Sequence, residues 1–148
     1  MLHFSLGLVA AFAIAVGLTL PTVTAAPLSA LAAGVDAAGC AKLASGLSLP
    51  QTRVTAAEAI SGGSFTPARG RALANLPGFC RVAATSQPAV RFEVWLPLTT
   101  WNRKFQVVGN GANAGAISYD AMATALRRGY AVASTDTGHA TTNARDAS

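Results

Sequence analysis

The segment that most constrains the fold runs from Lys104 to Asp136 and reads KFQVVGNGANAGAISYDAMATALRRGYAVASTD. Its pattern is an apolar strand, a glycine-rich loop, an amphipathic helix and a second apolar strand. Ser118 or Asp120 is placed to cap the helix, and Gly129 follows its basic C-terminal end, where glycine commonly stops a helix. Two strands that are joined through a helix lie parallel in one sheet. The segment therefore predicts an α/β fold with a partly parallel sheet.

Another strand is predicted just before this segment, at Val90–Pro97. Its sequence, VRFEVWLP, alternates Val, Phe and Val with Arg, Glu and Trp, which is the period of a half-buried strand. We expect Arg91 and Glu93 to be solvated and Trp95 to pack against other residues. The strand at 104–108 follows after a short turn, so we expect the two strands to pair as a hairpin.

The chain before these strands carries weaker signals. Residues 41–47 are predicted to form a turn or two of helix. Residues 53–60 match a short capped helix, but they match a strand that turns at a glycine pair at least as well. Residues 66–80 contain two prolines and two glycines, and are therefore expected to be mostly loop.

The N-terminus has the composition of an export signal. Residues 1–26 contain no Lys, Arg, Asp or Glu, and Leu6–Leu20 is almost unbroken apolar sequence. We predict a signal peptide at 1–26 that is cleaved near Ala25 or Ala26, and hence a secreted or periplasmic protein without stable membrane association. The alternative is an uncleaved anchor, but the apolar run is shorter than the ~20 residues that span a bilayer. Residues 27–39 are small and Ala-rich and are expected to be flexible.

Export bears on the two cysteines, Cys40 and Cys80. Disulfides persist outside the cytosol, and two thiols in an exported chain most simply pair with each other. Two buried free thiols are the alternative. We predict the disulfide, which would close a loop of about 40 residues and contribute roughly 3 to 4 kcal/mol in the chain-entropy treatment. The sequence contains no Cys-x-x-Cys or Cys/His cluster, so we expect no metal site.

The charge pattern argues against nucleic acid as a partner. The formal net charge is +5, and nine of the eleven basic residues are Arg. These arginines are scattered along the chain without a run or stripe, and aromatic residues do not alternate with them as a single-strand binding platform requires. Dispersed charge of this kind is typical of a solvated surface.

The glycine loop at 109–115 admits three interpretations. A dinucleotide cradle needs G-x-G-x-x-G, which Gly109 and Gly111 fit with Ala114 in third place, and Asp136 stands where a carboxylate would bind ribose. An oxyanion hole also needs bare backbone after a central strand, so that N–H groups can reach a carbonyl oxygen. A plain tight turn is the third interpretation. Exported, disulfide-bonded proteins rarely use soluble nicotinamide cofactors, so we expect no cofactor.

Several motifs occur in a characteristic order, namely LPGFCRV, EVWLP, WNRKF, GNG and STDTGH. Together they resemble the N-terminal part of the tannase and feruloyl esterase family of secreted α/β-hydrolases, from Cys40 to about His139. The resemblance implies an α/β-hydrolase fold, in which residues 40–148 form the N-terminal part of the catalytic domain, and a disulfide that matches Cys40–Cys80. The usual G-N-G-G-F-A-G of the family is GNGANAG here, so Ala112 carries a Cβ where the backbone is normally bare.

The resemblance also implies hydrolysis of aromatic carboxylic esters (galloyl, feruloyl or related phenolic esters) by a Ser-His-Asp triad without a cofactor. The nucleophile is expected beyond residue 148, because no G-x-S-x-G occurs, and the chain alone is expected to be inactive. Gly111 and Ala112 are the oxyanion-hole candidates. Asn110, Asn113 and Tyr119 are the candidates for lining the pocket.

One cluster holds all three triad residue types within six positions, namely Ser134, Asp136 and His139. Nucleophile, base and orienting carboxylate generally come from separated segments, so we do not interpret this cluster as a triad. We expect Asp136 and His139 to brace the loop after the strand. Two other functions stay open, a nucleotide-binding βαβ protein and a non-catalytic secreted binding module.

Overall fold

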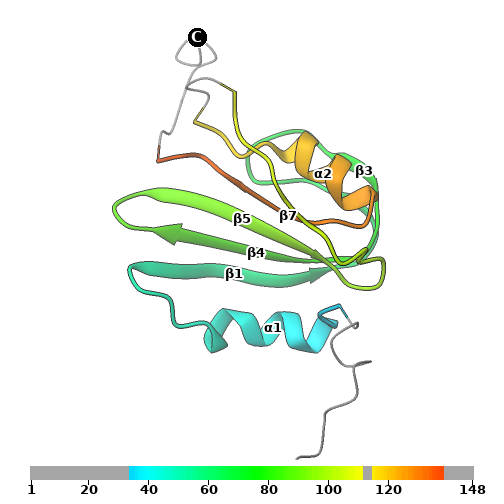
Figure 1. Ribbon diagram of the computed structural model, residues 1–148, viewed down its shortest axis with the longest axis horizontal. Helices are drawn as coiled ribbons and strands as arrows, with labels where there is room; N and C mark the ends of the chain where they lie inside the picture. Colours follow the sequence, from blue (N-terminus) through cyan, green and yellow to red (C-terminus); the bar gives the residue numbers. More distant parts are fainter. Residues whose placement is uncertain (1–33, 112–114, 139–148) are drawn as a thin grey trace, which may run out of the picture.

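A five-stranded mixed sheet is the centre of the computed structural model, which describes residues 34–111 and 115–138 (Figure 1). The predicted signal peptide at 1–26 lies outside the described residues. In sheet order the strands are β1 (Thr52–Ile60), β4 (Phe79–Ser86), β5 (Val90–Pro97), β7 (Ala131–Thr135) and β6 (Phe105–Val107). The pairs from β1 to β7 are antiparallel, and β6 lies parallel to β7. The predicted α/β character with a partly parallel sheet is confirmed.

The predicted hairpin between β5 and β6 is wrong, because β7 lies between them. β7 pairs antiparallel with β5 on one side and parallel with β6 on the other. The connection after β5 does not turn back onto that strand. Instead, Asn102 donates hydrogen bonds from its backbone N to the carbonyl of Gly129 (2.9 Å) and from Nδ2 to that of Arg128 (2.8 Å). These contacts hold the connection at the end of helix α2, away from the edge of β5. β7 pairs with that edge instead.

Helix α2 (Tyr119–Arg127) forms where the sequence predicts it. Its apolar face is buried in the core, through Met122, Ala123, Ala125 and Leu126. Gly129 ends the helix with φ of +79°, and a Cβ at this position would lie 2.4 Å from the carbonyl oxygen of Thr100. Glycine is therefore required there both by the backbone conformation and by the close approach of the neighbouring chain.

Helix α1 (Ala37–Gly46) packs against β1 and β4, and it begins earlier than the sequence indicates. Asp36 caps it, accepting a hydrogen bond from Gly39 N (2.6 Å), so the last three residues of the segment expected to be flexible are helical. The Cys40–Cys80 disulfide is present, with its Cα atoms 5.6 Å apart, and it links α1 to β4. Residues 53–60, predicted as either a short capped helix or a strand, form a strand within β1.

The segment 66–80 contains more structure than the expected loop. β3 (Leu73–Leu76) pairs with β2 (Gly63–Phe65) in a small separate sheet. Leu73 and Leu76 are both buried against the core beneath α2, and this packing outweighs the nearby prolines and glycines. The expectation of a loop is therefore wrong for these four residues, and also for Phe79 and Cys80, which begin β4.

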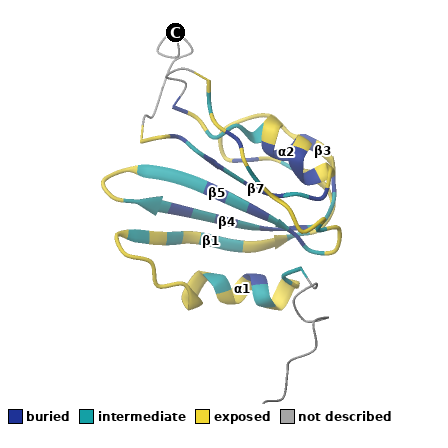
Figure 2. Cartoon of the chain, viewed as in Figure 1, coloured by how far each residue is buried: buried dark blue, intermediate teal, exposed yellow. Residues whose placement is uncertain are grey.

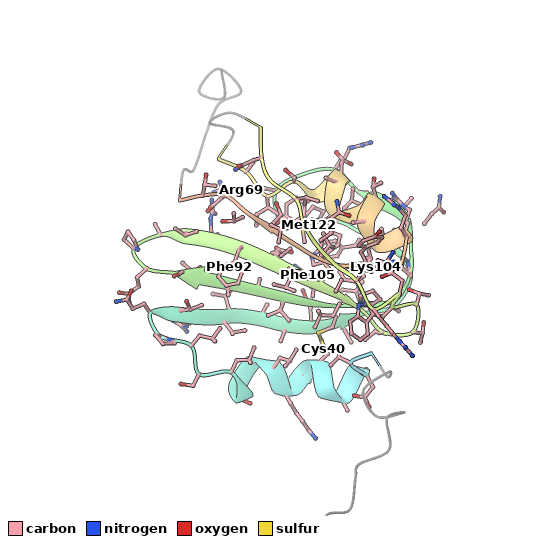
Figure 3. The ribbon with its side chains drawn as sticks, viewed as in Figure 1. Cys40, Arg69, Phe92, Lys104, Phe105 and Met122 are labelled. Carbon is pink, nitrogen blue, oxygen red and sulfur yellow. A yellow bond between two sulfur atoms is a disulfide. The ribbon has the colours of Figure 1, made fainter. Side chains whose placement is uncertain are left out.

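The two faces of the main sheet carry separate apolar clusters. Phe79 and Cys80 are adjacent on β4 and point to opposite faces, Phe79 into the cluster under α2 and Cys80 into the cluster under α1. Figure 3 shows Met122 between α2 and the sheet and Cys40 between α1 and the sheet. Buried positions follow β4, β5, β7 and the inner side of α2 (Figure 2). In the described part of the chain, no helix has the length and apolarity needed to cross a membrane.

Candidate functional site

The glycine loop lies at the edge of the sheet where the parallel strands β6 and β7 end. Ligands of open α/β sheets bind outside these carboxyl ends, where loops leave the strands. Gly109, Asn110 and Gly111 are described there, and the chain is described again from Gly115 onward. The candidates Ala112 and Asn113 lie outside the described residues.

Three hydrogen bonds hold the base of this loop. Ser118 Oγ donates to the carbonyl of Gly109 (2.8 Å), and Ser118 N donates to Ser134 Oγ (3.0 Å). Asn110 Nδ2 donates to the carbonyl of Thr135 at 3.3 Å. The loop is therefore tied both to the start of α2 and to the end of β7.

A groove of about 590 Å³ opens beside the loop. Its lining includes Asn110 and Gly111, the first residues of α2 with Tyr119 among them, and the arginines Arg69 and Arg71. The N-terminal end of a helix carries partial positive charge and backbone N–H groups without helical partners. Asp120 also lines the groove and pairs with Arg71 at 2.8 Å. Arg69 and the N-terminal end of α2 are therefore the described positive groups that suit the groove to a ligand with accepting oxygen atoms.

The backbone at Gly109 and Gly111 is open. A Cβ added at either position would meet nothing within 4 Å among the residues that the structure describes, and neither has the positive φ that favours glycine. Packing of the described residues and backbone conformation therefore do not account for glycine at either place. Bare backbone that faces open space is a way to let another molecule approach closely.

Asp136, at the end of β7, is buried and fully engaged. Its carboxylate accepts hydrogen bonds from Arg91 N (2.8 Å), Arg91 Nε (2.7 Å) and Gly138 N (3.0 Å). Burial alone would raise the pKa of Asp136, but these hydrogen bonds and the charge of Arg91 lower it below its ordinary value. A carboxylate used in this way is not free to bind a ribose. His139 lies outside the described residues.

The sequence reasoning missed a polar cluster around Glu93. The expectation that Glu93 is solvated is wrong, since only 3% of the residue is exposed. Its carboxylate accepts two hydrogen bonds from Arg81, one from Trp95 Nε1 (2.9 Å) and one from the hydroxyl of Tyr119 (3.0 Å). Glu93 shares the face of Trp95 on β5, which α2 covers, and the paired strand β4 supplies Arg81 from the same face.

This cluster sets the protonation of two of its members. Burial, together with the negative charge of Glu93 and its hydrogen bond, raises the pKa of Tyr119 to about 12. The hydrogen bonds from Arg81 to Glu93 raise the pKa of Arg81 above its already high value, although burial opposes them. A hollow of about 350 Å³ lies beside the cluster and is lined by all three of these side chains. The sequence did contain a signal that Glu93 is buried. Trp95, two positions further along β5, lies on the same face and is expected to pack.

Ser134 is placed to support the loop rather than to act as a nucleophile. It is 1% exposed, and its oxygen accepts the hydrogen bond from Ser118 N. Among the described residues, no group of three or more His, Cys, Asp or Glu is placed to hold a metal ion.

The chain is similar to known esterases in both sequence and structure. The family described as tannase and feruloyl esterase matches residues 74–148. An uncharacterized esterase of Xanthomonas campestris pv. campestris is 45% identical over 121 residues, which cover 78% of this chain and 21% of that protein. A probable feruloyl esterase B-1 of Aspergillus oryzae is 37% identical over 65 residues, 41% of this chain and 12% of its own length.

Two solved structures from Aspergillus oryzae are similar in fold. Feruloyl esterase B gives a TM-score of 0.65 at 26% identity, covering 72% of this chain and 22% of the other. A further esterase gives 0.63 at 25% identity, covering 70% and 22%. The chain thus spans about a fifth of the length of the Xanthomonas esterase and of these two structures.

Proposed function

The chain belongs to the tannase and feruloyl esterase family, and on this premise we propose that it forms part of a secreted carboxylic ester hydrolase. Residues 40–148 would form the N-terminal part of an α/β-hydrolase catalytic domain. The substrates would be aromatic esters, galloyl, feruloyl or related phenolic esters, attacked by a Ser-His-Asp triad without a cofactor. The 148 residues contain no G-x-S-x-G motif, so we propose that other segments of the enzyme supply this triad.

The observation that carries the proposal is the glycine loop. Hydrolysis of an ester passes through a tetrahedral intermediate whose oxygen bears negative charge, and backbone N–H groups aimed at that oxygen lower the barrier. Gly111 follows the carboxyl ends of the parallel strands and lines the groove, and no atom of the described residues lies within 4 Å of where its Cβ would stand. We propose that its N–H is one oxyanion donor. Ala112, outside the described residues, is the second candidate.

The pocket candidates have a role in the same proposal. Asn110 and Tyr119 both line the groove next to Gly111, and Asn113 follows in the loop. The Tyr119 hydroxyl donates to Glu93, so its ring would contribute an apolar wall while its oxygen is engaged elsewhere. We propose that the ring borders the acyl or alcohol part of the ester. Asp136 would brace the loop after β7 through Gly138, together with His139.

Export is the third part of the proposal. The uncharged apolar segment at 1–26 has the layout of a signal peptide, and the Cys40–Cys80 disulfide suits an oxidising compartment. N-terminal sequencing of the protein recovered from periplasm or culture medium tests it. A mature N-terminus at or near residue 27 would support export. A protein recovered with Met1 intact would contradict it.

Sequencing the coding DNA beyond residue 148 is the first experiment for the catalytic function. A frame that continues into a serine elbow, followed by an Asp and a His, would support an esterase. The encoded protein is then assayed on methyl ferulate and methyl gallate, with the purified 148-residue chain as the control that is expected to be inactive. A stop codon directly after residue 148, or hydrolysis by the 148-residue chain, would contradict the proposal. The stop codon would favour a non-catalytic binding module.

A further inference from the structure

Two serine hydroxyls connect the glycine loop to the interior of the sheet. Ser134, near the end of β7, is 1% exposed and accepts a hydrogen bond from Ser118 N at 3.0 Å. Ser118 Oγ donates to the carbonyl of Gly109 at 2.8 Å. A buried strand, the start of α2 and the loop are therefore joined by one chain of hydrogen bonds.

The position of Ser118 makes this arrangement unusual. Ser118 immediately precedes α2, and a serine at this position normally accepts a hydrogen bond from a backbone N–H of the first helical turn. Here its side chain makes no such bond to the helix. The hydroxyl serves the loop, so capping of α2 does not explain why it is placed there.

A third tie acts on the next residue of the loop. Asn110 Nδ2 donates to the carbonyl of Thr135, also on β7. With the Gly109 carbonyl and the Asn110 side chain both held, the peptide plane between these residues and the Cα of Asn110 are fixed. The φ and ψ torsions of Asn110 are the backbone rotations between that peptide plane and the N–H of Gly111, and the side-chain bond of Asn110 restricts φ.

We propose that Ser118 and Ser134 are positioning residues for the esterase reaction, which fix the direction of the Gly111 N–H by holding the carbonyl of Gly109. The inference rests on the proposed function. An oxyanion donor is effective because it is oriented before charge develops, so that little reorganisation is needed during the reaction. Neither serine touches the substrate. Each acts through the loop backbone.

The test uses the complete enzyme that contains these 148 residues, assayed on methyl ferulate. Ser118→Ala removes the hydrogen bond from the hydroxyl to the Gly109 carbonyl. It keeps the hydrogen bond that the backbone N–H of residue 118 donates to Ser134 Oγ. Its kcat is expected to fall about tenfold, while KM stays within about twofold, because the bond matters most in the transition state. Ser118→Thr keeps the hydroxyl at a half-buried position and is expected to restore kcat to within about threefold of the wild type.

A matched control lies one turn into the same helix. Thr124 Oγ1 donates to the carbonyl of Asp120 at 2.9 Å, so Thr124→Ala also removes one hydroxyl-to-backbone bond from an exposed position of α2. Its kcat is expected to stay within about twofold of the wild type, because this bond does not reach the loop. Equal losses of kcat in the two alanine variants would show general weakening of α2 and overturn the inference.

A second readout separates positioning from stability. A boronic acid that mimics the tetrahedral intermediate should bind Ser118→Ala about tenfold more weakly, whereas the product acid, ferulate, should bind equally well. An active wild type, with Ser118→Ala unchanged in kcat and in boronate affinity, would overturn the inference alone. A complete wild-type enzyme without esterase activity would overturn the proposed function, and the inference with it.

Discussion

Replacing Glu93 with glutamine tests whether the buried cluster at the start of α2 depends on charge. The Glu93 carboxylate is 3% exposed and accepts hydrogen bonds from Arg81, Trp95 and Tyr119. Glutamine has almost the same shape, but it carries no charge and turns an NH₂ group toward donors. The side chain of Arg81 is 16% exposed and would keep only Glu58 as its ionic partner.

The expected loss of stability follows from these burial values. Removing one partner of a buried ion pair costs about 3–5 kcal/mol, because the remaining charge stays desolvated. Arg81 keeps its contact with Glu58 and is partly exposed, so the expected loss for Glu93→Gln lies near the lower end of this range, at about 3 kcal/mol. Such a loss is a large fraction of the roughly 5–15 kcal/mol that stabilises a typical domain.

Urea unfolding followed by the fluorescence of buried Trp95 measures the effect, and the free-energy difference is taken from the midpoints at a common slope. Glu58→Gln is the matched control. It removes the other carboxylate on the same arginine, but the Glu58 side chain is 49% exposed, so about 0–1 kcal/mol is expected. If the two variants differed by less than about 1 kcal/mol, the reasoning from burial would be refuted.

Three further predictions concern the disulfide and two titrating groups. Reduction of Cys40–Cys80, which closes a loop with a sequence separation of 40, is expected to lower the free energy of unfolding by about 4 kcal/mol in urea melts; unchanged midpoints would contradict this. Because the pKa of Tyr119 is raised to about 12 from an ordinary 10.0, its stabilising contribution is complete below pH 10 and is lost as the pH rises through 12. Phenolate absorbance of native protein should then show a transition near pH 12 that Tyr119→Phe removes, and a native protein without it would disprove the shift. The pKa of Asp136 is lowered from 3.8, so its contribution is present above that value and is lost as the pH falls through the folded-state pKa. Asp136→Asn should therefore flatten the acid side of the stability profile, and an identical acid side in both proteins would count against the effect.

Local patterns in the sequence predicted the elements that are stabilised by nearby residues. α2 and its stop at Gly129 follow from the apolar spacing and the glycine itself, and β7 follows from a short apolar run. The disulfide followed from export and a count of two cysteines. The β3 strand was missed, because Leu73 and Leu76 are stabilised by packing under α2 and not by their own neighbours.

The candidate site also combines features set by nearby residues with features set by distant ones. The position of Gly111 at the end of a strand could be inferred from sequence, but the ties from Ser118 and Ser134 could not, since these residues lie 16 positions apart and meet only when β7 lies beside the loop. The sequence predicts solvent around Arg91 and Glu93, because alternation separates the two faces of β5 without saying which one is covered.

The sequence by itself determined the βαβ unit with its glycine loop, the pairing of the cysteines and the family, because these depend on short motifs and on residue chemistry. The tertiary structure alone decided that β7 lies between β5 and β6, and that Glu93 is buried with Arg81 beneath α2. Strand order and the burial of a charge depend on which distant segments come to lie alongside each other. That choice is made by the total packing and hydrogen bonding of the assembled sheet, which no single stretch of the chain contains.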